Sequence, residues 1–320
     1  MSSDADEDLT ADEDLTAEED RAARLACGMW TLYEPIHVVT YFAPAARSAF
    51  EDAGLRGLWR GYFAGRAAPL GRVGPAPVTA LFFGFAPSMV ARALPAVWNL
   101  LEPGTVLAVR RAGAIAALRA LLPDAAAVAV AADALAAVAV SVEPAGRALG
   151  AANAALLAAD DPDDDPFGRL WQAATTLREH RGDGHVAALV TAGLTGAQSL
   201  VLRAGVDLDR AVLQPARGWT DEQWDDAAAG LVARGLLTSG GAATDAGRQL
   251  VRRIERLTDD AAAPPWSAAP SVATGLAQLL APMARACHQV LPEANPIGLP
   301  PIWDPAGPAV LPDRFAGRVG

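Results

Sequence analysis

The chain has 320 residues, of which 52% are hydrophobic and 20% are charged, and its formal net charge is −11. A composition this apolar can bury enough surface to offset chain entropy, which excludes disorder over the whole chain. All 26 basic residues are arginine, which excludes P-loop and Schiff-base lysines, and the two cysteines, Cys27 and Cys287, lie too far apart for a CxxC pair or a cysteine zinc knuckle.

The absence of a cysteine framework favours a reducing compartment, and we expect a cytoplasmic protein. The negative charge is concentrated at the N-terminus, where residues 1–20 carry ten acidic side chains and no basic one. Subtracting those ten from −11 leaves −1 for the other 300 residues. Residues 1–20 also contain a tandem Ala-Asp-Glu-Asp-Leu-Thr repeat and few apolar side chains, so we expect a disordered acidic tail and not a signal peptide.

Helical periodicity dominates residues 21–159, the expected helical domain. The pattern predicts a first helix at 22–33 that stops near Glu34, because the next residue is a proline. The apolar run at 125–142 is rich in alanine and contains Asp133, so it predicts a buried packing helix and no membrane contact. The other helices expected in this region are 44–53, 58–65, 77–83, 88–94, 103–122 and 145–158.

Residues 21–120 carry eleven arginines against four acidic residues. Two interpretations are open: arginine stems that cover a helical surface, or a site for an anionic ligand. His37 lies among aromatic residues in this region. It is either a buried histidine with satisfied hydrogen bonds or, with Tyr62 and Arg66, part of a ligand-binding site that has the phenylalanines of 82–85 as its apolar wall.

The run at 160–166 holds five aspartates and two prolines and predicts a domain boundary. Residues 167–260 form the expected second domain, and residues 261–320 are expected to form a C-terminal helix and an extended arm. The helices predicted between 167 and 260 are 167–181, 185–192, 196–203, 209–217 and 221–234, followed by a further helix that reaches 259.

The eight residues at 178–185 include two histidines, two arginines and two acids, the densest group of chemically active side chains in the chain. One interpretation is structural: Gly182 ends one helix, and the carboxylate of Asp183 caps the next one. Under this interpretation the charged side chains around the turn are solvated.

A second interpretation of the same segment is functional. Arg178, Arg181 and Asp183 would form an anion-binding corner at a helix N-terminus, and His180 or His185 would act as acid or base. A metal site is disfavoured, since an i, i+5 histidine pair diverges by about 140° on a continuous helix. We therefore expect no metal, and the sequence identifies no cofactor.

Residues 230–259 combine an Arg-Gly-Leu-Leu helix end, a Thr-Ser-Gly-Gly-Ala-Ala link, and a turn in which Thr244 is followed by Gly247 and Arg248. This arrangement resembles the C-terminal half of a MarR-type winged helix. In that family a recognition helix ends in Arg-Gly-Leu, a two-stranded wing follows, and a Thr-x-x-Gly-Arg turn starts the helix of the dimer interface. The whole chain also resembles a group of actinobacterial helix-turn-helix proteins.

The patterns together predict a mainly α protein, with an N-terminal helical region and a winged-helix-like C-terminal region that carries a small β-wing. We expect a pocket between the two regions, and the resemblance makes a homodimer possible. The helix at 221–234, which the resemblance makes the recognition helix, holds four acids against Arg234 alone. Phosphate contacts require positive charge, so we expect no strong nucleic-acid binding.

The function we expect is the binding of a small aromatic or anionic molecule, as the resemblance implies for phenolic compounds, with weak or no binding to DNA. The first alternative is an enzyme of specialised metabolism that uses His180 or His185, with Arg178 and Arg181, for acid/base chemistry on an anionic substrate. The second alternative is a MarR-like transcription regulator.

Overall fold

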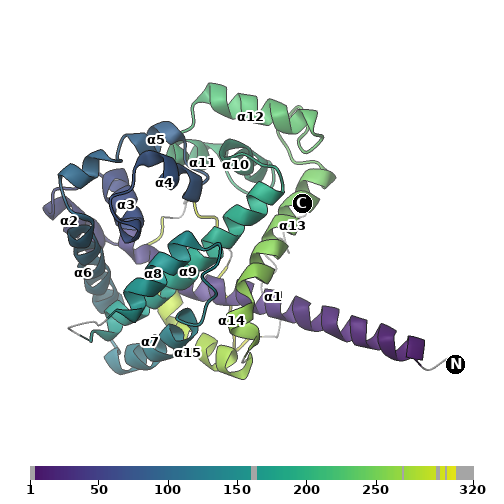
Figure 1. Ribbon diagram of the computed structural model, residues 1–320, viewed down its shortest axis with the longest axis horizontal. Coiled ribbons are helices and arrows are strands. Elements are labelled where there is room, and N and C mark those ends of the chain that lie inside the picture. The colour runs from purple at the N-terminus through teal and green to yellow at the C-terminus, as the bar shows by residue number, and fades with distance from the viewer. Residues whose placement is uncertain (1–3, 160–163, 269, 293–295, 300, 308–320) are drawn as a thin grey trace.

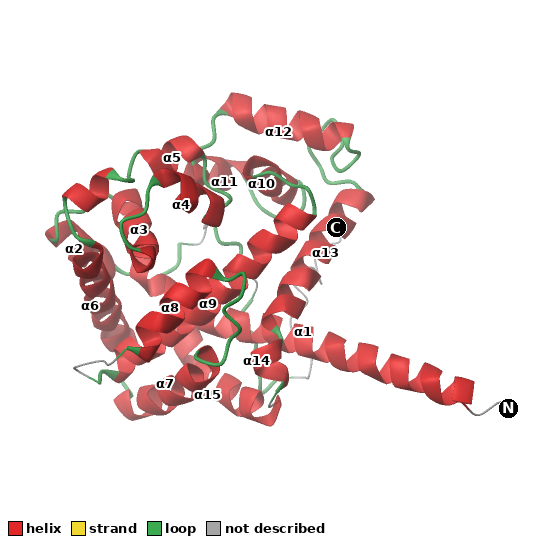
Figure 2. Ribbon diagram, in the orientation of Figure 1, coloured by secondary structure: helices red, strands yellow, loops and turns green. Residues whose placement is uncertain are grey.

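The computed structural model describes residues 4–159, 164–268, 270–292, 296–299 and 301–307. Helices make up nearly all of the regular structure (Figures 1 and 2). The α-helices and the two 3₁₀ helices are α1 (Asp4–Phe42), α2 (Pro44–Asp52), α3 (Leu58–Ala67), η1 (Ala68–Leu70), α4 (Pro75–Leu81), α5 (Pro87–Ala91), η2 (Ala96–Asn99), α6 (Pro103–Leu121), α7 (Ala125–Ala139), α8 (Ala148–Ala158), α9 (Pro166–Thr191), α10 (Gly196–Ala204), α11 (Arg210–Arg217), α12 (Asp221–Ala233), α13 (Asp245–Ala262), α14 (Pro264–Ser267) and α15 (Pro270–His288).

Helix α9 runs through the middle of the body (Figure 1) and contacts α1, α6, α7, α8 and α13. Its first half contributes Trp171 to a buried apolar cluster shared with α1, α6, α7, α14 and α15. A second cluster gathers α2 to α5, and a third joins the end of α9 to α10, α11, α12 and α13. Because α9 takes part in the first and third clusters, residues on both sides of 160–166 share a core; the division into domains there stays a prediction.

The prediction that the first helix stops near Glu34 is wrong, because α1 continues through Pro35 to Phe42. A proline inside a helix costs about 3 kcal/mol. The residues that follow it, Ile36, Val38 and Val39, are at most 1% exposed. Burial of each such side chain contributes roughly 1.5–3 kcal/mol, so packing outweighs the local cost.

At its other end, α1 begins at Asp4, inside the segment for which the sequence predicts disorder. Asp20 forms an exposed ion pair with Arg256 of α13. The described part of the predicted C-terminal arm also packs on α1, where the backbone N–H of Trp303 donates to the Thr31 hydroxyl at 2.9 Å; residues 308–320 of that arm lie outside the described residues.

The expected turn at 182–184 is wrong, since α9 continues through Gly182, Asp183 and Gly184 to Thr191. The Arg147 guanidinium occupies the space where a Cβ at position 184 would lie. From there it donates to the carbonyls of His180 and Ala261, both at 3.0 Å, and ties the start of α8 to α9 and α13. Glycine at 184 therefore serves a close crossing and not a helix end.

Asp183 is a capping residue, as one interpretation of the sequence required, but the helix it caps is α8. Its carboxylate Oδ2 accepts from the backbone N–H groups of Leu149 and Gly150, each at 2.9 Å. The residue that precedes α8, Arg147, makes no side-chain cap of its own. A residue 33 positions further along the chain thus satisfies the open donors of this helix.

The predicted β-wing is also wrong: no β-strand occurs in the described residues, and the fold is mainly helical (Figure 2). Leu237 and Ala243 form one isolated antiparallel bridge. The Gly241 N–H closes a tight turn onto the Thr238 carbonyl at 2.9 Å. The Ala243 N–H donates to the carbonyl of Gly205, in the turn after α10, at 2.9 Å, so the pairing ends after a single bridge.

Within the described part of the chain, no single helix is both long and apolar enough to cross a membrane. Helices α9 and α10 together reach the length and apolar composition of a membrane span, but the chain bends by 93° between them.

We expect Asp183→Ala to lower the free energy of unfolding by roughly 1–3 kcal/mol, because two buried N–H groups of α8 lose their acceptor. Asp183→Asn should cost less than about 0.5 kcal/mol, because an amide oxygen accepts the same bonds and burial already raises the pKa of this carboxyl. Asp124→Ala, which removes an exposed cap of α7, is the matched control and should cost about 1 kcal/mol. Urea unfolding measures all three; equal losses for the Asn and Ala variants would contradict the capping role.

Candidate functional site

A cavity of about 240 Å³ lies where α1, α3, α9, α10, α11 and α13 meet. The loop at 81–85 and residues 296–297 complete its wall. The cavity is therefore bounded by helices from the N-terminal region and from the C-terminal region, which is the place where the sequence predicts a pocket.

One face of α9 forms much of the cavity wall. Arg178, Arg181, Gly182, His185 and Leu189 all line it. Their spacing of 3, 4, 7 and 11 residues from the first member places them on one side of a continuous helix. The same residues would not share a face if the helix had ended at 182.

The wall contributed by the loop and α3 is aromatic. Tyr62, Phe82, Phe83 and Phe85 line the cavity. The ring centroids of Tyr62 and Phe85 lie 5.4 Å apart, and the Arg66 guanidinium lies 4.0 Å from the centroid of the Phe82 ring. Such contacts give this wall a closely packed aromatic surface.

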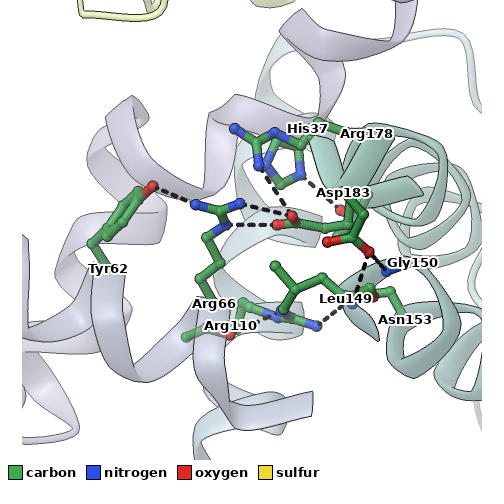
Figure 3. Close-up of polar contacts among 12 residues, drawn as sticks. His37, Tyr62, Arg66, Arg110, Leu149, Gly150, Asn153, Arg178 and Asp183 are labelled. Carbon is green, nitrogen blue, oxygen red and sulfur yellow. Dashed lines mark hydrogen bonds and ion pairs between the residues drawn. The ribbon is translucent and has the colours of Figure 1, made fainter. Parts of the chain in front are cut away.

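A buried ion-pair network joins α1, α3 and α9 beside this wall (Figure 3). Glu179 accepts from Arg66 through both carboxylate oxygens, at 2.8 and 2.9 Å, and from Arg178 at 3.1 Å. Arg178 also donates to Glu34 at 3.3 Å, and Glu34 accepts from the Trp30 indole at 3.1 Å. The network fixes the positions of Arg66 and Arg178, both of which line the cavity.

The charges of this network are strongly coupled. Burial alone would raise the pKa of Glu179, but the positive charges of Arg66 and Arg178 outweigh it and hold the pKa well below its ordinary value. Glu179 is therefore ionised in the folded protein at neutral pH. Since Glu179 is only 1% exposed, its charge depends on these two partners.

A second group of ion pairs lies between α9, α10 and α13. Arg181 pairs with Asp259 and lies 3.9 Å from Glu255. Arg203 donates to Glu255 at 3.3 Å and to Asp207 at 2.7 Å. Both arginines line the cavity, and their guanidinium charges are compensated by carboxylates of the protein itself.

Of the histidines proposed as acid or base, only His185 lines the cavity, and its Nδ1 lies 3.0 Å from the Thr258 hydroxyl. His180 faces α8, where its backbone packs against Gly150 so closely that a Cβ there would lie 2.9 Å from the His180 Cα. Burial, together with the charge of Arg147, lowers the pKa of His180 to about 4. His180 is therefore uncharged at neutral pH and does not line the cavity.

His37 is buried in the helical core, and its Nδ1 lies 3.0 Å from the Thr175 hydroxyl (Figure 3). Burial and the charge of Arg178 lower its pKa well below the ordinary value. Neither His37 nor Asp183 lines the cavity. The candidate residues that the structure brings together around it are Tyr62, Arg66, Arg178, Arg181 and His185.

Four further residues line the cavity although the sequence does not single them out as site residues: Glu34, Gly182, Arg203 and Arg217. The sequence pattern places Glu34 at a helix end and Gly182 in a turn. Arg203 and Arg217 lie on predicted helices, but only their tertiary positions bring them to the cavity. A continuous helical pattern through 178–189 was the available signal for Gly182.

The described residues contain no group of three or more histidine, cysteine, aspartate or glutamate side chains placed to hold a metal ion. Five arginines line the cavity, and their guanidinium groups are donors only. They are suited to hold anionic or hydrogen-bond-accepting groups of a ligand.

Comparison with known proteins identifies the class. The chain belongs to a helix-turn-helix family, whose model matches residues 26–292. The match includes the cavity-lining helices α3, α9, α10, α11 and α13. No curated protein and no solved structure matches the chain in the corresponding searches.

Replacing Glu179 by glutamine should lower the free energy of unfolding by roughly 3–5 kcal/mol at pH 7, because Arg66 and Arg178 lose a buried counter-charge. The folded pKa of Glu179 is depressed, so its contribution is complete above its ordinary pKa near 4.5 and is lost as the pH falls below that value. The difference between wild type and variant should therefore shrink between about pH 5 and pH 3.

The control for this prediction is Glu102→Gln, because Glu102 pairs with Arg72 on the surface and both side chains are mostly exposed. Solvent screens such a pair, so its loss should change the stability little. Urea unfolding followed by circular dichroism at three pH values measures both variants. A pH-independent loss for Glu179→Gln would contradict the assigned ionisation.

Proposed function

We propose that this protein binds a small molecule with an apolar, aromatic body in the cavity between α3, α9, α11 and α13. The observation that carries the proposal is the lining itself, in which Tyr62 and the phenylalanines of 82–85 form an aromatic wall and five arginines supply the positive charge. Ligand sites in proteins combine a mostly apolar surface with a few placed polar groups in this way.

The size of the cavity limits the ligand. A dry cavity of roughly 150 Å³ is known to accommodate benzene. The cavity here, about 240 Å³, has room for one substituted ring and a polar group. A single-ring compound fits it better than a large cofactor.

The glycine at position 182 is a second observation in favour of a ligand site, because it leaves space in the cavity. Glycine in the middle of a helix costs roughly 1 kcal/mol relative to alanine. A Cβ at this position would meet nothing closer than 3.8 Å, so no close helix crossing requires a glycine here, in contrast to Gly184. The absent side chain leaves free space on the cavity face of α9.

A ligand-responsive regulator is the second candidate function, since the chain belongs to a helix-turn-helix family. The observation that favours it is the proximity of the cavity to α12. Arg217 lines the cavity, and Thr220, three residues later, caps the start of α12. The Trp219 indole donates to the Gly84 carbonyl at 2.9 Å and links this junction to the aromatic loop.

Helix α12 itself does not favour direct contact with DNA. Asp221 and Asp225 are exposed on it, and both pair with Arg210 of α11. Two further acids, Glu222 and Asp226, lie on the same helix. A surface of this charge repels phosphates, so regulation would act through a protein partner or through a different surface.

Filling the cavity tests ligand binding directly. Gly182→Leu should remove a small molecule that native mass spectrometry detects on the purified wild-type chain, while Gly182→Ala should retain it and raise the free energy of unfolding by about 0.5–1 kcal/mol. Gly275→Leu on α15 is the matched control, because that glycine is also helical, has open space at its Cβ and lies outside the cavity. A wild-type chain without any bound molecule, which also fails to bind single-ring aromatic compounds, would contradict the proposal.

Binding to DNA should remain weak. We expect no duplex complex tighter than the ~10⁻⁴–10⁻⁶ M of non-specific association at physiological salt. An electrophoretic shift with genomic fragments, run with and without the molecule that co-purifies, is the measurement. A nanomolar, sequence-selective complex would contradict the expectation and would favour direct DNA regulation.

A further inference from the structure

The arginines around the cavity differ in their partners. Four of them are compensated by carboxylates of the protein: Arg66, Arg178, Arg181 and Arg203. The fifth, Arg217, ends α11, and among the described residues no carboxylate lies within ion-pair distance of it. The cavity wall therefore carries one positive charge that the described chain does not balance.

Arg217 is nevertheless held in place. Its guanidinium lies 4.5 Å from the centroid of the Phe85 ring and donates to the Pro296 carbonyl at 3.0 Å. Both of these partners are neutral. Burial lowers the pKa of Arg217, which shows that its surroundings disfavour an isolated charge.

Tyr62 extends this group toward the cavity. It lies beside Arg217, since both pack against the Phe85 ring, and its hydroxyl oxygen accepts from Arg66 at 3.2 Å. A phenol that accepts from an arginine keeps its own O–H for donation. Arg217 and Tyr62 thus present neighbouring donors beside the aromatic wall.

We propose that the ligand is a monoanion, an aromatic carboxylate whose carboxylate group binds Arg217 and Tyr62 and whose ring lies against Phe85. This inference rests on the proposed function and specifies the ligand class. A carboxylate matches the planar donor fork of a guanidinium. A phosphate monoester, with a charge of about −1.5 to −2 at pH 7, would need a second uncompensated cation.

Three probes of similar size separate the effect of ligand charge on affinity from the effect of ligand shape. Benzoate is a monoanion, benzamide is its neutral counterpart, and phthalate carries two carboxylates. Isothermal titration of the full-length protein at pH 7 should show that benzoate binds at least tenfold more tightly than either of the other two, a difference of about 1.4 kcal/mol.

Variants at Arg217 test whether its guanidinium binds the carboxylate of benzoate. Arg217→Gln should weaken benzoate binding at least tenfold and leave benzamide binding unchanged, and Arg217→Lys should restore part of the benzoate affinity because it keeps the charge. The matched control is Arg210→Gln, on the same helix, whose guanidinium pairs with surface aspartates. Melting curves establish that each variant is folded, and the comparison of probes on the wild type holds even where a variant is not.

Two results would overturn the monoanion inference and leave the proposed function intact: equal affinity for benzoate and benzamide, or full benzoate affinity in folded Arg217→Gln. The monoanion inference would also fail, and the proposed function would stand, if a neutral molecule co-purified with the wild type and was absent from Gly182→Leu. Absence of binding for all three probes, together with a wild-type chain that carries no molecule as purified, would overturn the inference and the proposed function together.

Discussion

The bidentate pair between Arg66 and Glu179 is the interaction on which the rest of the site depends. It joins α3 to α9 in the interior, where Glu179 is 1% exposed, and Arg178 extends it to Glu34 of α1. An unpaired charge in such a place costs several kcal/mol, so each member requires the others. The result is a rigid polar frame that spaces three helices and leaves a cavity beside it.

The frame has this effect because α9 is continuous. Asp183, on the same helix, caps α8, and Gly184 lets Arg147 cross toward α13. Residues 178–185 therefore serve two faces of one helix: one face packs on α8, and the other, with Arg178 and His185, lines the cavity. The same segment holds structural and cavity-lining residues, so its residue types are compatible with both interpretations of the sequence.

The sequence was sufficient where local physics dominates. The helical class and the start of the helix at residue 221 follow from periodicity, and Tyr62 and Arg66, which line the cavity, are candidates by residue type. It failed where tertiary packing overrides local preference. Pro35 is tolerated because the residues after it are buried, and the predicted wing ends after a single bridge because the Ala243 N–H donates to the distant Gly205 carbonyl. Arg217 differs from the other cavity arginines because no carboxylate of the described residues pairs with it. Whether a charge is paired depends on the three-dimensional structure and cannot be read from the spacing of residues in the sequence.

The central claim is that the Arg66 and Glu179 pair holds α3 and α9 around the cavity, and a double-mutant cycle with Arg66→Met and Glu179→Leu tests it most directly. Equilibrium unfolding at pH 7 gives the free energy of each single variant and of the double variant. The account predicts a coupling energy of about 2 kcal/mol or more, because each single variant leaves a buried charge that the double variant removes. Losses that add to within about 0.5 kcal/mol would show that the pair does not hold the two helices together.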